Sequence, residues 1–157
     1  MPPRGKSNPR KQYFDSVKSQ KLETLRWCLK HGGISVKAED DEGHTAIQIA
    51  AHGGLADSLE CLIENVRKVG EAADLEETDE DGKTPLMMAC HAGKLECVRL
   101  LVLQGKVKLP GPKCEAGKTA RMYAETRKHD KIVAFLDNPS APPEEEEEEE
   151  EDAGEAE

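Results

Sequence analysis

Aromatic residues are scarce in this chain of 157 residues, which has one tryptophan, two tyrosines and two phenylalanines. A core must therefore be built from Leu, Ile, Val, Met and Ala, which suits closely packed helices better than a β-sandwich. No apolar run approaches the ~20 residues of a membrane span, so we expect no membrane-spanning helix. The start, MPPRGKSNPRKQ, has no apolar segment and is not expected to be a secretory signal.

Motifs for metal binding and catalysis are also missing. The five cysteines form no Cys-x-x-Cys pair of the kind that zinc sites use, and their odd number suggests no disulfide framework. This favours a reducing compartment, so we expect a cytoplasmic or nuclear protein. There is no glycine-rich phosphate loop and no nucleophile elbow. We therefore expect no enzymatic activity, no cofactor, no metal and no small-molecule ligand.

The acidic charge is concentrated at the C-terminus. The stretch EEEEEEEEDAGEAE, from residue 144, contains eleven of the 32 acidic residues, which leaves 32 − 11 = 21 acids against 22 bases elsewhere. Because eight consecutive glutamates repel one another, residues 139–157 are predicted to be a disordered tail. Residues 1–12 are predicted to be a disordered basic arm. The arm has four basic residues without interleaved aromatics, so we do not expect direct binding of nucleic acid.

The body of the chain repeats itself. Three segments align, opening at Gly43, Gly82 and Gly117, which lie 39 and then 35 residues apart. In each segment the glycine permits a turn with positive φ, and the following Thr can cap a helix. Each segment is followed by a second apolar stretch with helical spacing. The pattern predicts a repeated unit of turn, short helix, loop and longer helix.

The stretch DGKTPLMMACHAGKLECVRLLVLQG, residues 81–105, resembles the ankyrin repeat. That family's signature opens with Gly-x-Thr-Pro-Leu-His, continues with an Ala-Ala pair and ends its second helix with Leu-Leu and Gly; Met87 replaces the histidine. EGHTAIQIAAHGG matches with Ala46 for Pro and Gln48 for His, and GKTARMYAETRKHDKIVAFL resembles a C-terminal capping repeat. The resemblance implies an all-α solenoid of stacked helix-turn-helix units with short hairpin fingers. It covers residues 13–138, in units of about 13–40, 41–79, 80–114 and 115–138.

The chain departs from the family pattern in three places. The second unit exceeds the usual ~33 residues, and the excess near residues 66–73 predicts a longer second helix and a longer loop. Pro110 and Pro112 are predicted to disrupt the third finger. The first unit lacks the Gly-x-Thr-Pro opening, so residues 14–32 are predicted to be a cap made of one irregular helix and one regular helix.

Cys90 and His91 are neighbours that could begin a thiol or metal site. On a helix, however, adjacent side chains do not share a face. Cys90 aligns with Ala51, which predicts a small buried side chain, and His91 aligns with His52 at the exposed end of the first helix. We therefore favour packing for Cys90 and partner binding for His91. Cys114 lies in a predicted loop and is expected to be the most exposed thiol.

The resemblance implies a partner-binding surface made of the finger tips and the exposed end of each first helix. The matching positions are Asp41, Glu42, His44, His52, Glu80, Asp81, Lys83, His91, Lys118 and Arg127. This surface is acidic over the first two fingers and basic over the last. The alternative is that these charges serve only turn formation and solubility.

The sequence thus predicts a non-catalytic protein–protein interaction module. The tail could be only a solubilising extension, could engage or shield a basic client protein such as a histone or a ribosomal protein, or could fold back onto the basic last unit. The alternative class is a permanent structural adaptor of a larger assembly, cytoskeletal or axonemal for example, with an exposed apolar patch. Neither the partner nor the oligomeric state follows from the sequence.

Overall fold

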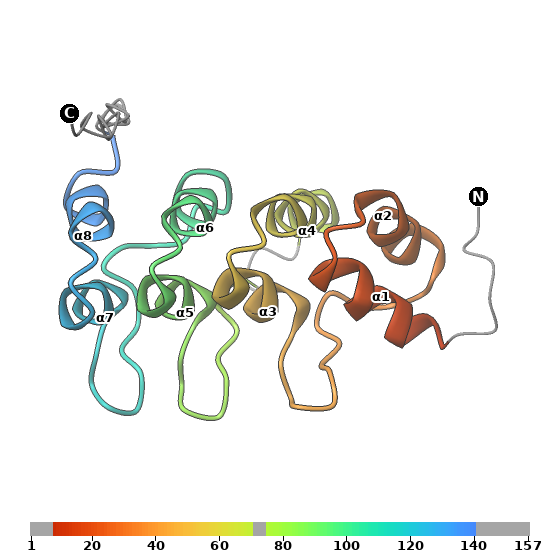
Figure 1. The fold of residues 1–157 in the computed structure, drawn as a ribbon, viewed down its shortest axis with the longest axis horizontal. Helices are drawn as coiled ribbons and strands as arrows, with labels where there is room; N and C mark the ends of the chain where they lie inside the picture. The colour runs from red at the N-terminus through yellow and green to blue at the C-terminus, as the bar shows by residue number, and fades with distance from the viewer. Residues whose placement is uncertain (1–7, 71–74, 141–157) are drawn as a thin grey trace, which may run out of the picture.

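The computed structural model describes residues 8–70 and 75–140, and within them the helices form four stacked antiparallel pairs (Figure 1). The first helices of the pairs form one layer and the second helices form the other. In chain order the pairs are α1 (Pro9–Lys18) with α2 (Leu22–His31), α3 (Ala46–Gly53) with α4 (Ala56–Val69), α5 (Pro85–Ala92) with α6 (Leu95–Arg99), and α7 (Ala120–Thr126) with α8 (Asp130–Asp137). A π-helical turn, η2 (Leu100–Gln104), continues α6.

Three hairpin fingers project from the layer of first helices: finger one (residues 39–45), finger two (78–84) and finger three (113–119) (Figure 1). Among the described residues, β pairing is limited to one isolated bridge between Glu39 and Thr45, at the base of finger one. This architecture confirms the predicted all-α solenoid of helix-turn-helix units. Because the units stack in the order in which they follow in the chain, each unit buries its apolar side against the units before and after it.

The predicted capping residues begin the first helices. The hydroxyls of Thr45, Thr84 and Thr119 accept hydrogen bonds from the third backbone N–H groups of α3, α5 and α7. Pro85 occupies the first position of α5, where its missing N–H leaves no hydrogen bond unmade. The glycine two residues before each threonine has a φ of 73–79°, which a residue with a Cβ adopts at a cost.

The first helices contribute small buried side chains to the core. Ala50, Ala51, Ala89 and Cys90 are all fully buried. The second helices contribute the larger apolar side chains, among them Leu59, Leu62, Ile63, Val98 and Leu101. Cys90 therefore lies in the hydrophobic core, as predicted, and burial raises the pKa of its thiol to about 12.

The N-terminal cap differs from the prediction. Its first helix, α1, is a regular ten-residue helix that starts at Pro9, so residues 9–12 belong to the folded domain and not to a disordered arm. The Asn8 side chain caps α1 by accepting from Arg10 N–H, and Pro9 occupies the first helical position. The cap presents polar side chains to solvent, among them Lys18, Gln20, Lys21, Arg26 and Lys30.

The long second helix of the second unit is confirmed, because α4 extends over 14 residues to Val69, and Gly70 caps its end with φ +81°. The loop predicted to follow it falls in residues 71–74, outside the described residues, as do residues 1–7 of the arm and the glutamate run of the tail. Within the part of the chain that the structure describes, no helix is long and apolar enough to cross a membrane.

Finger three keeps its hairpin, contrary to the prediction. The N–H of Cys114 donates to the carbonyl of Lys118 at 3.0 Å, as Asp79 N–H does to Lys83 and Asp40 N–H to His44 in the other fingers. Pro110 and Pro112 precede this turn. The hydrogen bond that closes the turn therefore needs no backbone N–H at these two positions.

Gly93 ends α5 with φ +74°, and a Cβ there would lie 2.6 Å from the His129 ring. Gly117 has nearly the same φ, +73°, but a Cβ there would meet nothing within 4 Å. We expect Gly117→Ala to lower the free energy of unfolding by about 1 kcal/mol through backbone strain alone. Gly93→Ala adds overpacking against His129 and should cost about 1–3 kcal/mol more. Urea unfolding of both variants measures the difference, and equal losses would contradict the tight contact.

Candidate protein-binding groove

An aspartate holds each of the first two fingers. Asp40 Oδ1 accepts hydrogen bonds from the backbone N–H groups of Glu42 and His44 at 2.9 and 3.0 Å. Asp79 Oδ1 accepts from Asp81 and Lys83 at 3.0 and 2.8 Å. A short carboxylate that bonds to N–H groups of its own turn fixes the loop conformation. Each aspartate is therefore held against its turn and contributes a negative charge near the helices.

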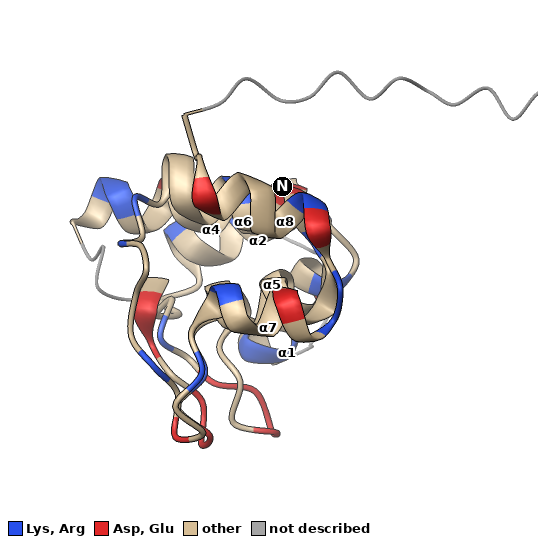
Figure 2. Ribbon diagram, turned by 90° about the vertical axis from the view of Figure 1, so that its left-hand side faces the viewer, with Lys and Arg blue, Asp and Glu red and all other residues tan. Residues whose placement is uncertain are grey.

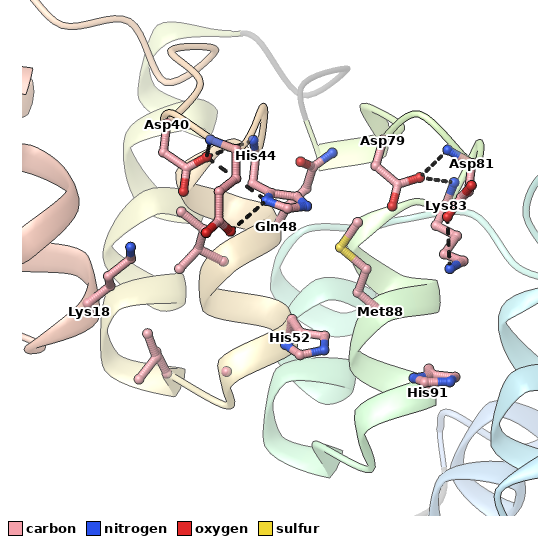
Figure 3. A pocket seen from close by; sticks show the side chains of 14 residues that line it. Lys18, Asp40, His44, Gln48, His52, Asp79, Asp81, Lys83, Met88 and His91 are labelled. Carbon is pink, nitrogen blue, oxygen red and sulfur yellow. Dashed lines mark hydrogen bonds and ion pairs between the residues drawn. The ribbon is translucent and has the colours of Figure 1, made fainter.

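A groove of about 640 Å³ lies between these two fingers and helices α3 and α5 (Figure 3). Its apolar lining comes from Ile49, Leu55 and Met88. Its polar lining is made of four carboxylates, two amines, three imidazoles and one amide, from Asp40, Glu42, Asp79, Asp81, Lys18, Lys83, His44, His52, His91 and Gln48. The groove thus combines an apolar floor with an acidic edge.

The groove brings together six of the ten residues predicted from the sequence: Glu42, His44, His52, Asp81, Lys83 and His91. Asp41 lines a second hollow of about 460 Å³, on the side of α1, with Arg10 and Lys11. Glu80 is exposed at the tip of finger two, and Lys118 and Arg127 belong to the last unit. The ten-residue partner-binding surface stays a prediction.

The sequence prediction did not include Asp40, Asp79, Lys18 or the apolar floor. A signal existed for the aspartates, because they occur four residues before His44 and Lys83 in successive units and could be expected to cap the turn. No comparable signal existed for Lys18, since α1 lacks the repeat motif and its position beside finger one depends on how the cap packs.

The outer acids of the groove are well exposed. The side chains of Glu42 and Asp81 are 82% and 71% exposed, whereas that of Asp40 is 12% exposed. Lys83 Nζ lies 3.2 Å from the Asp81 carboxylate. The tips of both fingers carry acidic residues, which project together from one side of the molecule (Figure 2). With four carboxylates against two lysines, the groove has a negative balance.

His91 and His52 differ in environment. His52 is exposed, but His91 is half-buried and accepts a hydrogen bond from the Arg127 guanidinium, whose Nε lies 3.2 Å from its Nε2. Burial, and then the positive charges of Arg127 and Lys83, hold the pKa of His91 below its usual range. A neutral imidazole is the form that accepts this bond. Arg127, which follows α7, therefore reaches back to the imidazole of His91, a residue that lines the groove.

Cys114 is buried, contrary to the prediction, with 5% of its surface exposed. The Tyr123 side chain from α7 covers it, and the Tyr123 hydroxyl oxygen lies 3.2 Å from Cys114 Sγ. This hydrogen bond is the main cause that lowers the pKa of Cys114, and it helps to raise the pKa of Tyr123 to about 12. Lys118 Nζ lies 5.7 Å from the centre of the Tyr123 ring, in cation–π contact.

The family model for ankyrin repeats in three copies matches residues 66–143 of the chain. The chain is an ankyrin-repeat protein. Ankyrin repeats mediate protein–protein interactions, and this agrees with the function class predicted from the sequence.

Curated relatives of this ankyrin-repeat protein match it over part of their length. Protein phosphatase 1 regulatory subunit 12A of Mus musculus is 37% identical over 81 residues, 52% of this chain and 7% of that protein. Ankyrin repeat domain-containing protein 63 of Mus musculus is 29% identical over 114 residues, 71% of this chain and 27% of that protein. E3 ubiquitin-protein ligase KEG of Arabidopsis thaliana is 35% identical over 78 residues, 47% of this chain and 4% of that protein. The chain thus spans 4 to 27% of the length of these relatives.

A solved structure shares the fold. A chain in the crystal structure of the yeast ribosomal protein Rps3 in complex with its chaperone Yar1 superposes with a TM-score of 0.71. The match covers 88% of this chain and 99% of that chain at 22% identity. At this identity the likeness establishes the ankyrin-repeat fold.

The bond between Cys114 and Tyr123 predicts the pH dependence of alkylation. The thiolate is the reactive form, and the Tyr123 hydroxyl stabilises it. Tyr123→Phe removes that hydroxyl, so the pKa of Cys114 should rise and the midpoint of its alkylation should move to higher pH. Alkylation with iodoacetamide between about pH 6 and 9, followed by peptide mass spectrometry, measures it. Cys90, in the core, serves as the unreactive control, and an unchanged midpoint would contradict the assignment.

The positions of His52 and His91 predict that both can be replaced without loss of the fold. We expect the His52→Ala, His91→Ala double variant to keep its helical circular dichroism and lose less than about 1 kcal/mol of unfolding free energy. It should bind the partner more weakly. His31→Ala, an exposed histidine on α2, is the matched control. Unfolding of the double variant would show that these side chains support the core instead.

Proposed function

We propose that this ankyrin-repeat protein is a non-catalytic binding module that takes a basic segment of a partner protein into the groove between fingers one and two. One observation carries the proposal: four carboxylates from two successive fingers line a groove whose floor is apolar. A lysine or arginine side chain could lay its aliphatic stem on Ile49 and Met88 and bring its charge to the finger carboxylates.

The strength of such binding depends on several weak contacts. An exposed ion pair contributes about 0.2–1 kcal/mol and weakens as salt is added. Two or three such pairs, together with contact on the apolar floor, support a reversible complex. Complementary charge also speeds association and discriminates against acidic partners.

The chemistry of the groove supports a role without catalysis. The ring nitrogen of His91 that could act as a base already accepts a hydrogen bond from Arg127. Cys90 lies in the core, and Cys114 lies beneath Tyr123, so neither thiol lines the groove. Cys90 and His91 are therefore adjacent in sequence but serve packing and the groove separately, which argues against a joint thiol or metal site.

The proposal extends to the polyglutamate tail and to localisation. The tail lies outside the described residues, and we propose that it engages or shields the same basic client, in the cytoplasm or the nucleus. The structure of similar fold is a complex of a ribosomal protein with its chaperone, which is one example of a client that such a module could hold. A solely solubilising tail and a tail that folds back remain the alternatives.

A permanent structural adaptor is the other candidate class. Obligate interfaces are large and apolar. Among the described residues, the exposed large apolar side chains are Val69, Leu103 and Met122, which come from α4, η2 and α7. They offer little contiguous apolar area, so the proposal favours a reversible complex.

Photocrosslinking in cells tests the proposed site. A crosslinking amino acid at position 52, in the groove, should capture a partner through a segment rich in lysine and arginine. The same group at the exposed position 67, on α4, should not capture it. Equal capture from both positions would argue against the groove.

Charge reversal then tests the mechanism on the captured partner. Glu42→Lys with Asp81→Lys should raise Kd about tenfold or more at low salt, because two attractive contacts become repulsive. Glu23→Lys with Glu64→Lys makes the same charge change on exposed positions of α2 and α4 and should have little effect. The proposal would be rejected if both pairs acted alike or if the captured segment were not basic.

A further inference from the structure

We infer that the groove recognises two basic side chains three residues apart on one extended segment in the polyproline II conformation. This inference rests on the proposed function and adds the number, spacing and backbone conformation of the recognised residues. Its basis is that the groove consists of two equivalent halves, one from each of two neighbouring units.

The two halves match position by position at the 39-residue offset of the repeat. Asp40 corresponds to Asp79, which opens the turn of each finger, and Glu42 corresponds to Asp81 within the turn. On the floor, Ile49 of α3 corresponds to Met88 of α5. All six residues line the same groove. Each unit therefore offers one inner carboxylate, one exposed carboxylate and one apolar floor residue to a single basic side chain.

The third unit does not extend this series. At the 35-residue offset, Cys114 replaces Asp79, Ala116 replaces Asp81, and Tyr123 replaces Met88. The Cys114 thiol bonds to Tyr123, and the amine of Lys118 lies over the same ring, so this end carries positive charge. Arg127 bonds to His91 beside it. The acidic series therefore stops after two units, which limits the number of recognised basic side chains to two.

The distance between the halves follows from helix packing. Helices α3 and α5 pack directly against each other. Axes of helices packed in this way lie about 8–10 Å apart. The two halves of the groove are separated by this distance between the helix axes. The two ligand side chains that enter the halves should therefore branch from the bound segment at points about 8–10 Å apart.

Polyproline II matches this spacing better than a β-strand. In polyproline II, residues i and i+3 share a face and lie about 9.3 Å apart, because the helix has three residues per turn and rises 3.1 Å per residue. In a β-strand, same-face residues lie about 6.7 Å apart at i+2 and about 13 Å apart at i+4. The strand spacings therefore fall on either side of the required distance.

An α-helical ligand gives the right spacing but requires more room. Residues i and i+7 of a helix lie about 10.5 Å apart, but a helix with side chains is at least 10 Å wide, as wide as the step of about 8–10 Å between the helices that carry the two halves. An extended segment with basic residues at i and i+3 is narrower, and apolar residues or proline between them can contact Ile49 and Met88.

Synthetic peptides test the spacing against the full-length protein. Three nine-residue peptides of one composition have two lysines in a proline- and alanine-rich background, at spacings i+2, i+3 or i+4. A fourth, longer peptide is rich in alanine, lacks proline, forms a helix and has lysines at i and i+7. We expect millimolar or tighter binding by calorimetry at low salt. The i+3 peptide should bind about fivefold more tightly than the others, a factor that corresponds to one exposed ion pair.

A double-mutant cycle assigns one lysine to each half. In the Glu42→Ala variant, replacing one of the two lysines of the i+3 peptide should have little further effect on its affinity. In the Asp81→Ala variant, replacing the other lysine of the peptide should have little further effect. Glu64→Ala, on α4, is the control and should leave binding and coupling unchanged.

The outcomes separate this inference from the proposed function. Equal affinity at all spacings, with binding still weakened by Glu42→Ala and Asp81→Ala, overturns the two-site spacing and leaves an acidic groove for basic partners. Preference for the helical peptide, or for i+2 or i+4, overturns the polyproline II conformation. Failure of every peptide to bind overturns the spacing inference, whereas the proposed function fails only if charge reversal of the groove leaves the crosslinked partner's affinity unchanged.

Discussion

Close packing between the first helices of neighbouring units determines the geometry of the proposed binding groove. Helices α3 and α5 pack directly against each other, and both carry small side chains that are fully buried: Ala50, Ala51, Ala89 and Cys90. Small side chains favour a close approach of two helices, and a dense interior has little capacity to accept larger ones. The separation of the helix axes fixes the separation of the fingers that precede them, and with it the distance between the carboxylates that a ligand meets. The ligand-facing surface therefore depends on residues that no ligand contacts.

The inner acids of the groove belong to the fold as much as to the binding surface. Asp40 and Asp79 each hold two backbone N–H groups of their own turn, so the carboxylate that contributes charge also keeps the finger in place. Glu42 and Asp81 are mostly exposed, and their carboxylates lie beside the exposed parts of His44 and Lys83 of the same finger. The charge of the groove can therefore change at the outer positions with little loss of stability, whereas a change at the inner positions also loosens a finger.

The sequence was sufficient to predict the features that repeat, because each repeated feature has a local cause. The threonine caps, the positive-φ glycines and the long α4 follow from residues within one unit. The predictions from the sequence were wrong where a feature depends on tertiary contacts or on residues outside the repeat. Cys114 is buried because Tyr123, nine residues later, folds over it. The start of α1 was missed because its Asn-Pro capping signal lies within a basic, proline-rich stretch. Four groove-lining acids come from two fingers that only the stacked fold brings together.

The last unit gives the groove a direction. Arg127 bonds to His91, and Lys118 lies over Tyr123, so positive charge follows the two acidic fingers along the stack. A uniformly basic segment would gain contacts at the fingers and lose them at this end, whereas a segment whose basic residues are followed by neutral or acidic ones would be favoured throughout. Discrimination against wrong partners requires unfavourable contacts as well as favourable ones. In the proposed complex Arg127 and Lys118 would supply such contacts, from a unit in which a cysteine–tyrosine pair has replaced the aspartate of the repeat.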